Sequence, residues 1–139
     1  MKLPPSIKVG LKAEATQEVT PDLTATHIGS GSLSVYATPA MASLVEHTCA
    51  SMVSGLLPEG QTTVGVEIHL RHLAPTPVNS VVNIRAEVVS IDNHLISFNA
   101  QIFDEVELVG EAEHRRAVIE EDRFLKRVDA KVSERLSTQ

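Results

Sequence analysis

The stretch ATPAMASLVEHTCASM, residues 37–52, decides the fold because it predicts one long helix of small and apolar residues. Thr38 followed by Pro39 is a typical helix start, with Thr38 as the expected N-cap residue. Apolar residues then recur at three- and four-residue steps on one face: Met41, Leu44, Val45, Thr48, Cys49, Met52, Val53 and Leu56. Gly55 marks the end of this helix. Its one carboxylate, Glu46, lies at the flank of the apolar face, where we expect partial desolvation or a partner.

Length and composition limit the classes of protein that the chain can belong to. We expect residues 1–139 to form a single domain with one core. The net charge of −6, with no basic stripe, argues against nucleic acid as a partner. No apolar run reaches the roughly 18 residues of a membrane span, and residues 1–10 lack an apolar signal core. The only cysteine, Cys49, excludes an intramolecular disulfide, so the sequence favours a cytoplasmic protein that is not bound to membranes.

Alternating apolar and polar residues predict strands in most of the remaining chain. We expect a first strand at 11–20, ended by Pro21, and then a loop at 21–37. Further strands are expected at 62–72, 81–91, 95–103 and 107–119. A sheet with one apolar face needs a cover, and only the helix at 38–57 suits. The sequence therefore predicts an α+β fold in which an antiparallel sheet of about five strands wraps around one long central helix.

A C-terminal amphipathic helix is predicted at 120–136, with acidic residues first and basic residues later, as the helix dipole favours. Its apolar residues repeat every four positions on what we expect to be the inner face: Phe124, Val128, Val132 and Leu136.

Three polar residues interrupt apolar patterns on three different elements. His72 has the same parity as the apolar residues of its strand, so it is expected on the core face with Val64, Val66, Ile68 and Leu70. Arg116 shares the parity of the inward residues of the last strand. Together with Glu46, they indicate a functional site. Taken singly, each also fits an ordinary role: Glu46 as a solvated helix residue, His72 as a strand-end histidine and Arg116 as a surface residue.

Other patterns favour structural roles. The HLRH segment at 69–72 sends its two histidines to opposite faces of a strand, so we expect no metal site there. Cys49 lies on the apolar helix face and is expected in the core. Gly65, inside a strand, is explained by a β-bulge. No dinucleotide-binding, P-loop, nucleophile-elbow or zinc-protease motif occurs.

Three stretches resemble the fluoroacetyl-CoA thioesterase group of hot-dog acyl-CoA thioesterases. They are VYATPAMASLVEHTCA at 35–50, VGVEIHLRHLAPTP at 64–77 and EHRRAVI at 113–119, and the element order agrees over nearly the whole chain. The resemblance implies a hot-dog fold and an enzyme that hydrolyses a small acyl-CoA thioester, with coenzyme A as part of the substrate and no separate cofactor. It also implies a homodimer with sites built between subunits, which the unpaired edges of a single sheet favour as well.

The same resemblance implies roles for five residues. Thr38, Glu46 and His72 would be catalytic, and Gly65 and Arg116 would contact the substrate. His72 would act as general base, and Thr38 as nucleophile or as the group that positions water. Glu46 would orient His72 or attack directly, and Arg116 would keep that carboxylate ionised.

The loop before the central helix departs from the family pattern. It reads HIGSGSLSVYATP at 27–39, with Gly29 and Ser32 near the positions of the family's lid aromatics. Tyr36 supplies its only aromatic ring and is a third expected substrate contact. This favours a general small acyl thioester over fluoroacetyl-CoA. Two other functions stay open: a hot-dog protein that binds acyl-CoA or another small ligand without turnover, and a hot-dog dehydratase or hydratase, whose acid–histidine arrangement we do not find.

Overall fold

The computed structural model describes residues 2–138, and its strands and helices follow the predicted order. The strands are β1 (Lys12–Glu18), β2 (Gln61–His72), β3 (Val81–Asp92), β4 (Leu95–Phe103) and β5 (Leu108–Glu120). The long helices are α2 (Thr38–Ser54) and α3 (Glu121–Ser137). The segment predicted as a loop contains a 3-10 turn, η1 (Pro21–Leu23), and a short helix, α1 (Ala25–Ile28). The sequence analysis missed α1, which Thr24 caps and Gly29, at φ 87°, ends.

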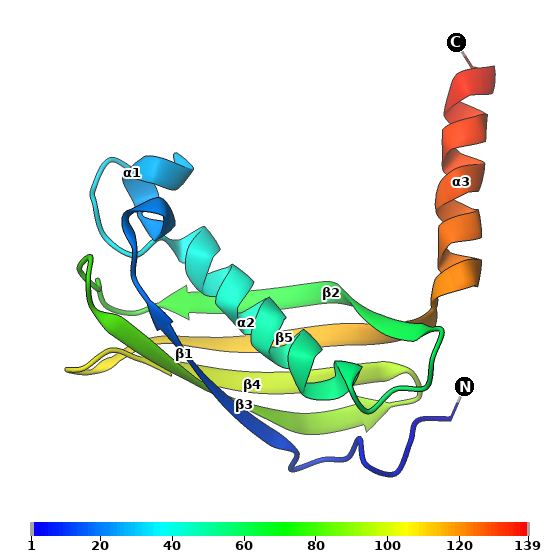
Figure 1. The fold of residues 1–139 in the computed structure, drawn as a ribbon, viewed down its shortest axis with the longest axis horizontal. Coiled ribbons are helices and arrows are strands. Elements are labelled where there is room, and N and C mark those ends of the chain that lie inside the picture. The colour runs from blue at the N-terminus through cyan, green and yellow to red at the C-terminus, as the bar shows by residue number, and fades with distance from the viewer. Residues whose placement is uncertain (1, 139) are drawn as a thin grey trace.

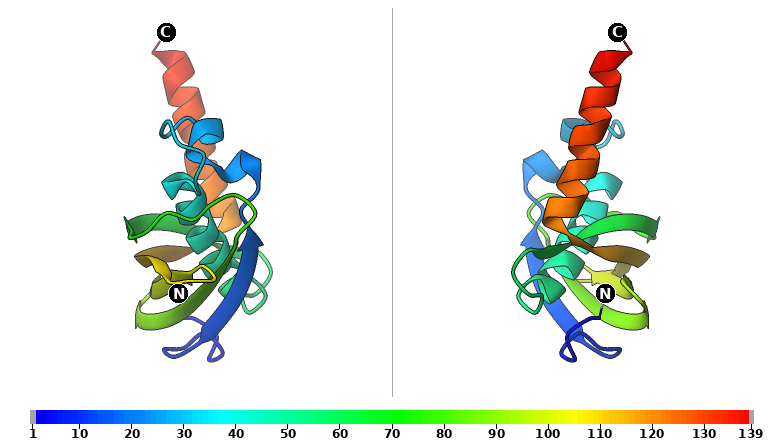
Figure 2. Two further views of the ribbon diagram at one scale, coloured as in Figure 1. Left: turned by 90° about the vertical axis from the view of Figure 1, so that its left-hand side faces the viewer. Right: turned by 90° about the vertical axis from the view of Figure 1, so that its right-hand side faces the viewer.

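The five strands form one antiparallel sheet in the order β1-β3-β4-β5-β2. The sheet curves around α2, which lies along its concave face (Figures 1 and 2). Asn93, at φ 55°, makes the tight turn between β3 and β4, because Asn tolerates this backbone conformation better than most residues. β2 follows α2 in the chain and lies at the edge of the sheet beyond β5. The predicted sheet and central helix are confirmed.

The alternation predicted for β2 is wrong in its first half. The register slips between Gly65 and Glu67, so that Gly65 lies opposite Arg116 whereas Glu67 lies opposite Arg115. Opposite residues of an antiparallel pair point to the same face, so Gly65 shares the inward face with Arg116. The extra residue of this β-bulge is Val66, which is 54% exposed. After the bulge the predicted parity holds, and His72 points inward.

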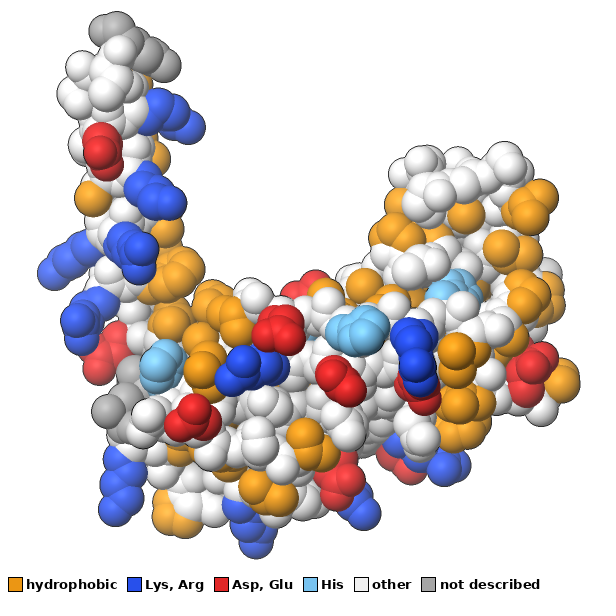
Figure 3. All heavy atoms as spheres, turned by 180° about the vertical axis from the view of Figure 1, so that it is seen from behind, with side chains coloured by type: hydrophobic (Ala, Val, Ile, Leu, Met, Phe, Trp, Pro, Cys, Tyr) orange, Lys and Arg blue, Asp and Glu red, His pale blue; other side chains and the backbone are white. Residues whose placement is uncertain are grey.

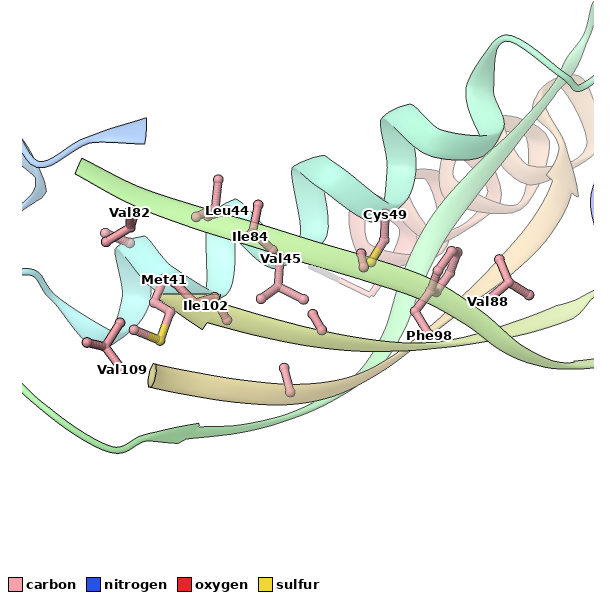
Figure 4. Packing of buried hydrophobic residues seen from close by; sticks show 14 of the residues in the cluster. Met41, Leu44, Val45, Cys49, Val82, Ile84, Val88, Phe98, Ile102 and Val109 are labelled. Carbon is pink, nitrogen blue, oxygen red and sulfur yellow. The ribbon is translucent and has the colours of Figure 1, made fainter. Parts of the chain in front are cut away.

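The core lies between α2 and the concave face of the sheet. Figure 4 shows side chains of α2 directed toward side chains from β3 and β4. The predicted inward residues of these strands are buried: Val82, Ile84, Ala86, Val88, Ile96, Phe98, Ala100 and Ile102. Burial raises the pKa of Cys49 to about 12, so this thiol is a packed core group. Gly110 allows close packing with Met41, whose side chain would have to move to admit a Cβ at this position.

The C-terminal helix α3 stands away from the sheet (Figures 1 and 2). Its first N–H group, that of Glu121, donates to the Gly60 carbonyl at 2.9 Å. This hydrogen bond fixes the start of α3 beside the start of β2. The prediction that its apolar stripe faces the domain is wrong for a single chain: Phe124, Leu125, Val128, Val132 and Leu136 are all exposed. The helix turns sharply away from the direction of β5 and does not fold back onto the sheet (Figure 1). Of the helices in residues 2–138, none combines the length and apolar character needed to cross a membrane.

Candidate active site

Thr38 and His72, predicted as site residues, lie in direct contact. The hydroxyl oxygen of Thr38 is 2.8 Å from Nδ1 of His72. Thr38 is the first helical residue of α2, and the N-cap residue is Ala37, whose side chain cannot cap. The N-cap role predicted for Thr38 is therefore wrong by one position. Its hydroxyl bonds to the last residue of β2 instead of to the helix backbone.

The first turn of α2 offers free hydrogen-bond donors beside this contact. Pro39 has no N–H group, and the N–H of Met41 donates to the Ala37 carbonyl at 3.0 Å. The N–H groups of Thr38 and Ala40 are thus left without a partner within the helix. Together with the positive end of the helix dipole, they favour a developing negative charge near Thr38.

The environment of His72 favours its neutral form. Burial lowers its pKa, and the backbone of Ala74 opposes this only in part. Tyr36 packs edge-on against the imidazole, with ring centroids 6.4 Å apart. Within residues 2–138 the Nε2 atom of His72 is buried and has no hydrogen-bond partner. A neutral imidazole whose Nδ1 atom faces a hydroxyl can accept the proton of that hydroxyl.

A pocket of about 310 Å³ opens at this contact. Its lining includes Thr38, His72, Tyr36, Val35 and Pro75. Tyr36 is fully buried, and its hydroxyl donates a hydrogen bond of 2.7 Å to Gln17 on β1, which fixes the ring as a wall of the pocket. Burial raises the pKa of Tyr36, so the phenol keeps its proton at neutral pH.

Glu46, the third predicted catalytic residue, lies in a different cluster. It lies about 12 Å further along the axis of α2 than Thr38, because each helical residue rises about 1.5 Å. Its Oε2 atom is 3.7 Å from Nη1 of Arg116, and the two side chains are 47% and 9% exposed. A Cβ at Gly65 would lie 2.6 Å from this carboxylate oxygen and 3.2 Å from Arg116. Within one chain, Thr38 and His72 therefore form one cluster. Glu46, Arg116 and Gly65 form a second cluster at a different place.

The second cluster contains a histidine that the sequence analysis missed. His114 is 2% exposed, and its ring stacks on Phe98 with centroids 6.1 Å apart. Its Nδ1 atom is 2.7 Å from the carbonyl oxygen of Glu67, and its Nε2 atom is 3.1 Å from Nη1 of Arg116. The signal was present in the stretch EHRRAVI, because residues two apart on a strand face the same side and Arg116 was expected inward.

Arg116 is fixed by further contacts with β2. Its Nε donates to the Thr63 hydroxyl at 2.8 Å, and its Nη2 to the Thr63 carbonyl at 3.2 Å. Burial lowers the pKa of Arg116, and the carboxylate of Glu46 opposes that shift in part. Residues 2–138 contain no group of three or more His, Cys, Asp or Glu arranged to hold a metal ion.

The sheet curved around one helix defines a hot-dog protein, and a threonine–histidine contact at the helix N-terminus is suited to a thioester hydrolase. The sequence model of the fluoroacetyl-CoA-specific thioesterase family matches residues 19–122, and the chain belongs to this family. It is similar to the fluoroacetyl-CoA thioesterase of Streptantibioticus cattleyicolor, with 32% identity over 97 residues, or 70% of each chain. The predicted family, fold and enzyme class are confirmed.

Solved structures agree with this assignment. One structure of the fluoroacetyl-CoA thioesterase FlK matches with a TM-score of 0.85 and 28% identity, over 90% of this chain and 97% of that chain. A hypothetical protein of Thermus thermophilus, described as a thioesterase superfamily member, matches with a TM-score of 0.86 and 21% identity over 96% of this chain and 98% of that chain. This second likeness shows the fold alone.

Proposed function

We propose that the protein is an acyl-CoA thioesterase that hydrolyses small, neutral acyl groups, with Thr38 and His72 of one subunit working beside Glu46 of the other. The observation that carries this proposal is the 2.8 Å contact between the Thr38 hydroxyl and His72 Nδ1, at a helix N-terminus that opens on a pocket. A thioester carbonyl needs a nucleophile, a base and stabilisation of the oxyanion, and this end of α2 offers all three.

Two routes fit the contact between Thr38 and His72. In the first, Thr38 Oγ1 attacks the thioester carbonyl and passes its proton to His72 Nδ1. The C–S bond then breaks, His72 returns the proton to the departing thiolate, and water hydrolyses the acyl-threonine. In the second, Thr38 positions a water molecule that attacks directly, with its proton taken by His72. In both, the N–H groups of the first turn of α2 face the oxyanion.

The pocket lining supports a small and neutral acyl group. Among the described residues, the lining contains no Lys, Arg, Asp or Glu, so a free carboxylate on the acyl chain would lack a cation. Its walls are mostly small or apolar, such as Ala25, Val35 and Ala74. The relative FlK has been solved with fluoroacetate and, as a threonine-to-serine mutant, with acetyl-CoA. Gly29 and Ser32 are exposed in the loop before α2 and do not line this pocket, so neither position supplies a large side chain to narrow it, which favours a broader range of short acyl groups.

The edge strand β2 supports a homodimer. Within residues 2–138 it pairs only with β5, and apolar residues remain accessible on it: Val66 is 54% and Ile68 37% exposed. An unpaired apolar edge is a ready site for a second strand. Figure 3 shows that α3 and the α1 region project from the same side of the molecule, with an open space between them. The exposed apolar stripe of α3 adds to the surface that a second subunit would cover.

Such a dimer also unites the two clusters. If two β2 strands pair antiparallel around a two-fold axis close to Ile68, residue 72 of one strand lies near residues 63–65 of the other, because the β-bulge adds one residue to each strand. The inward-facing Gly65 belongs to this segment, and Glu46 of that subunit lies against it. Glu46 of the partner subunit would then approach His72, whose Nε2 atom is buried and has no hydrogen-bond partner in the part of one chain that the structure describes. There it would orient His72 or act as the attacking group. We propose a cytoplasmic location for this dimer, where the thiol of Cys49 stays reduced.

The proposal is tested by measuring thiol release from a panel of short acyl-CoAs. We expect turnover by the wild-type protein and a loss of about 10²- to 10⁴-fold in His72→Ala, as removal of a general base produces. His69→Ala is the matched control, because His69 is an exposed histidine of the same strand. Equal activity of wild type and His72→Ala would refute the assignment. Tight acyl-CoA binding without thiol release would identify the protein as a binding module instead.

A further inference from the structure

The cluster around Arg116 contains one titratable group with no role in the proposed hydrolysis. His114 is buried behind Arg116 and does not line the pocket beside Thr38. It contacts groups from three strands: the carbonyl of Glu67 on β2, the guanidinium of Arg116 on β5 and the ring of Phe98 on β4.

The two polar partners of His114 dictate its protonation state. The Glu67 carbonyl can only accept, so Nδ1 must carry a proton and donate. Arg116 Nη1 can only donate, so Nε2 must be unprotonated and accept. Both contacts therefore require the neutral tautomer with its proton on Nδ1. Burial favours the same neutral form, since it lowers the pKa of His114, although the bond to Glu67 opposes that shift.

The β-bulge explains how a main-chain carbonyl comes to face His114. The register of β2 against β5 slips between Gly65 and Glu67, which turns part of the Glu67 backbone out of the regular ladder. The side chain of Glu67 points elsewhere, to an ion pair with Arg115. Phe98 fixes the plane of the imidazole from the other strand. The contacts with Glu67 and Phe98 thus fix the imidazole of His114 independently of Arg116.

Arg116 Nη1 is shared between His114 at 3.1 Å and Glu46 at 3.7 Å. The other guanidinium nitrogens are bonded to Thr63. The acceptor at His114 Nε2 adds an anchor to those at Thr63, and it acts on the nitrogen that reaches Glu46. Cys49, on the same side of α2, stays neutral because its pKa is raised, so it does not compete for the guanidinium.

We propose that His114 is a positioning residue, which holds Arg116 against Glu46 as a neutral acceptor anchored on the bulge carbonyl of Glu67. It acts through Arg116 and touches no substrate. The inference rests on the proposed function in one respect, since its effect on turnover requires that Glu46 takes part in hydrolysis.

Two amide substitutions separate the two hydrogen bonds of His114. His114→Gln places its amide near the position of Nε2 and keeps an acceptor for Arg116, whereas His114→Asn places it near Nδ1 and keeps only the bond to Glu67. His114→Phe keeps a flat ring against Phe98 and removes both bonds. We expect kcat to fall about tenfold in the Asn and Phe variants and to stay within about threefold of wild type in the Gln variant, with KM little changed in all three.

Crystal structures of the three variants provide a readout that does not depend on activity. We expect Arg116 to remain beside Glu46 in His114→Gln and to turn away from it in His114→Asn and His114→Phe. Ile102→Ala controls for stability, because Ile102 is a buried residue of the same sheet outside this cluster. Its kcat should match wild type at a temperature at which all variants are folded.

The outcomes distinguish this proposal from the proposed function. If Arg116 keeps its contact with Glu46 in both His114→Asn and His114→Phe, His114 does not position it and the proposal is overturned. The same holds if Ile102→Ala loses as much kcat as His114→Phe. If Glu46→Gln proves fully active while Arg116 moves in the His114 variants, the positioning role stands and the role of Glu46 in hydrolysis fails.

Discussion

The hydroxyl of Thr38 and Nδ1 of His72 lie 2.8 Å apart, although 34 positions separate these residues in the chain. The contact forms because β2 runs back along α2, so that the last residue of the strand returns to the first residue of the helix. It brings a hydroxyl, a half-buried neutral imidazole and free helix N–H groups to one end of the molecule.

Replacing Thr38 tests the role of its hydroxyl. Thr38→Val keeps the shape of the side chain but removes the group that contacts His72, so we expect kcat to fall by at least about 10²-fold. Thr38→Ser restores the hydroxyl and should recover most of the activity. Thiol release from acetyl-CoA under single-turnover conditions measures both. A Thr38→Val variant as active as Thr38→Ser would show that this hydroxyl has no chemical role.

Gly65→Ala should displace the carboxylate of Glu46. The new Cβ would lie 2.6 Å from Glu46 Oε2, closer than real contacts allow, so the side chain or the bulge must shift. We expect at least a tenfold loss of kcat with little loss of stability, because the group displaced is the end of a flexible side chain that is 47% exposed. Gly55→Ala is the control, since nothing lies within 4 Å of its Cβ and its φ of −76° suits alanine. Similar activity in the two variants would contradict the close approach of Glu46 to Gly65.

Stability should fall as the pH decreases below about 6.5, the ordinary pKa of histidine. Burial lowers the pKa of both His72 and His114 in the folded protein. Below pH 6.5 the unfolded chain therefore binds protons that the folded chain still rejects, and the free energy of unfolding decreases until the pH passes below the folded-state values. Each unit by which folding lowers the pKa of a histidine accounts for about 1.4 kcal/mol of this decrease.

Urea unfolding of wild type and His114→Gln at pH 7.5 and 5.0 measures this dependence. The variant should lose less stability between the two pH values, because its amide does not titrate. His69→Gln, a change at an exposed histidine, should behave as wild type. An equal loss in wild type and His114→Gln would mean that His114 does not resist protonation in the folded state.

Charge on the edge of β2 should disrupt the proposed dimer. Ile68→Lys places a charge in the middle of the strand that would pair with its copy, so we expect monomers at micromolar concentration in analytical ultracentrifugation. Val106→Lys, at an exposed valine in the turn between β4 and β5, is the control and should remain dimeric. A wild-type protein that sediments as a monomer would refute the dimer.

Mixing two inactive variants tests whether one site uses both subunits. In a heterodimer of His72→Ala and Glu46→Gln, one site carries both changes and the other carries neither. Random exchange of subunits should therefore restore about a quarter of the wild-type activity. Each variant refolded alone provides the baseline. If activity stays at that baseline although heterodimers form, His72 and Glu46 do not meet across the interface.

The alternation of β3 and β4 could be predicted because their register is regular from Asn83 to Val88 and slips only between Val88 and Ser90, beyond the predicted inward residues of β3, and their apolar residues are buried as expected. The same rule failed at the start of β2. There a bulge shifts the register by one residue, and nothing local in the sequence except Gly65 indicates it. The apolar stripe of α3 was read correctly as a pattern, but a pattern does not say what covers it, and in one chain it remains exposed.

By itself, the sequence determined the central helix, the antiparallel sheet around it and the family, because hydrophobic periodicity and local motifs are written in neighbouring residues. It also identified Thr38, Glu46, His72, Gly65 and Arg116 as candidates. Only the tertiary structure decided their grouping. The pairing of Thr38 with His72, and of Glu46 with Arg116 and His114, depends on how β2 returns along α2 and on where its bulge resets the inward face. These are long-range distances, and the periodicity of a single element contains no information about them.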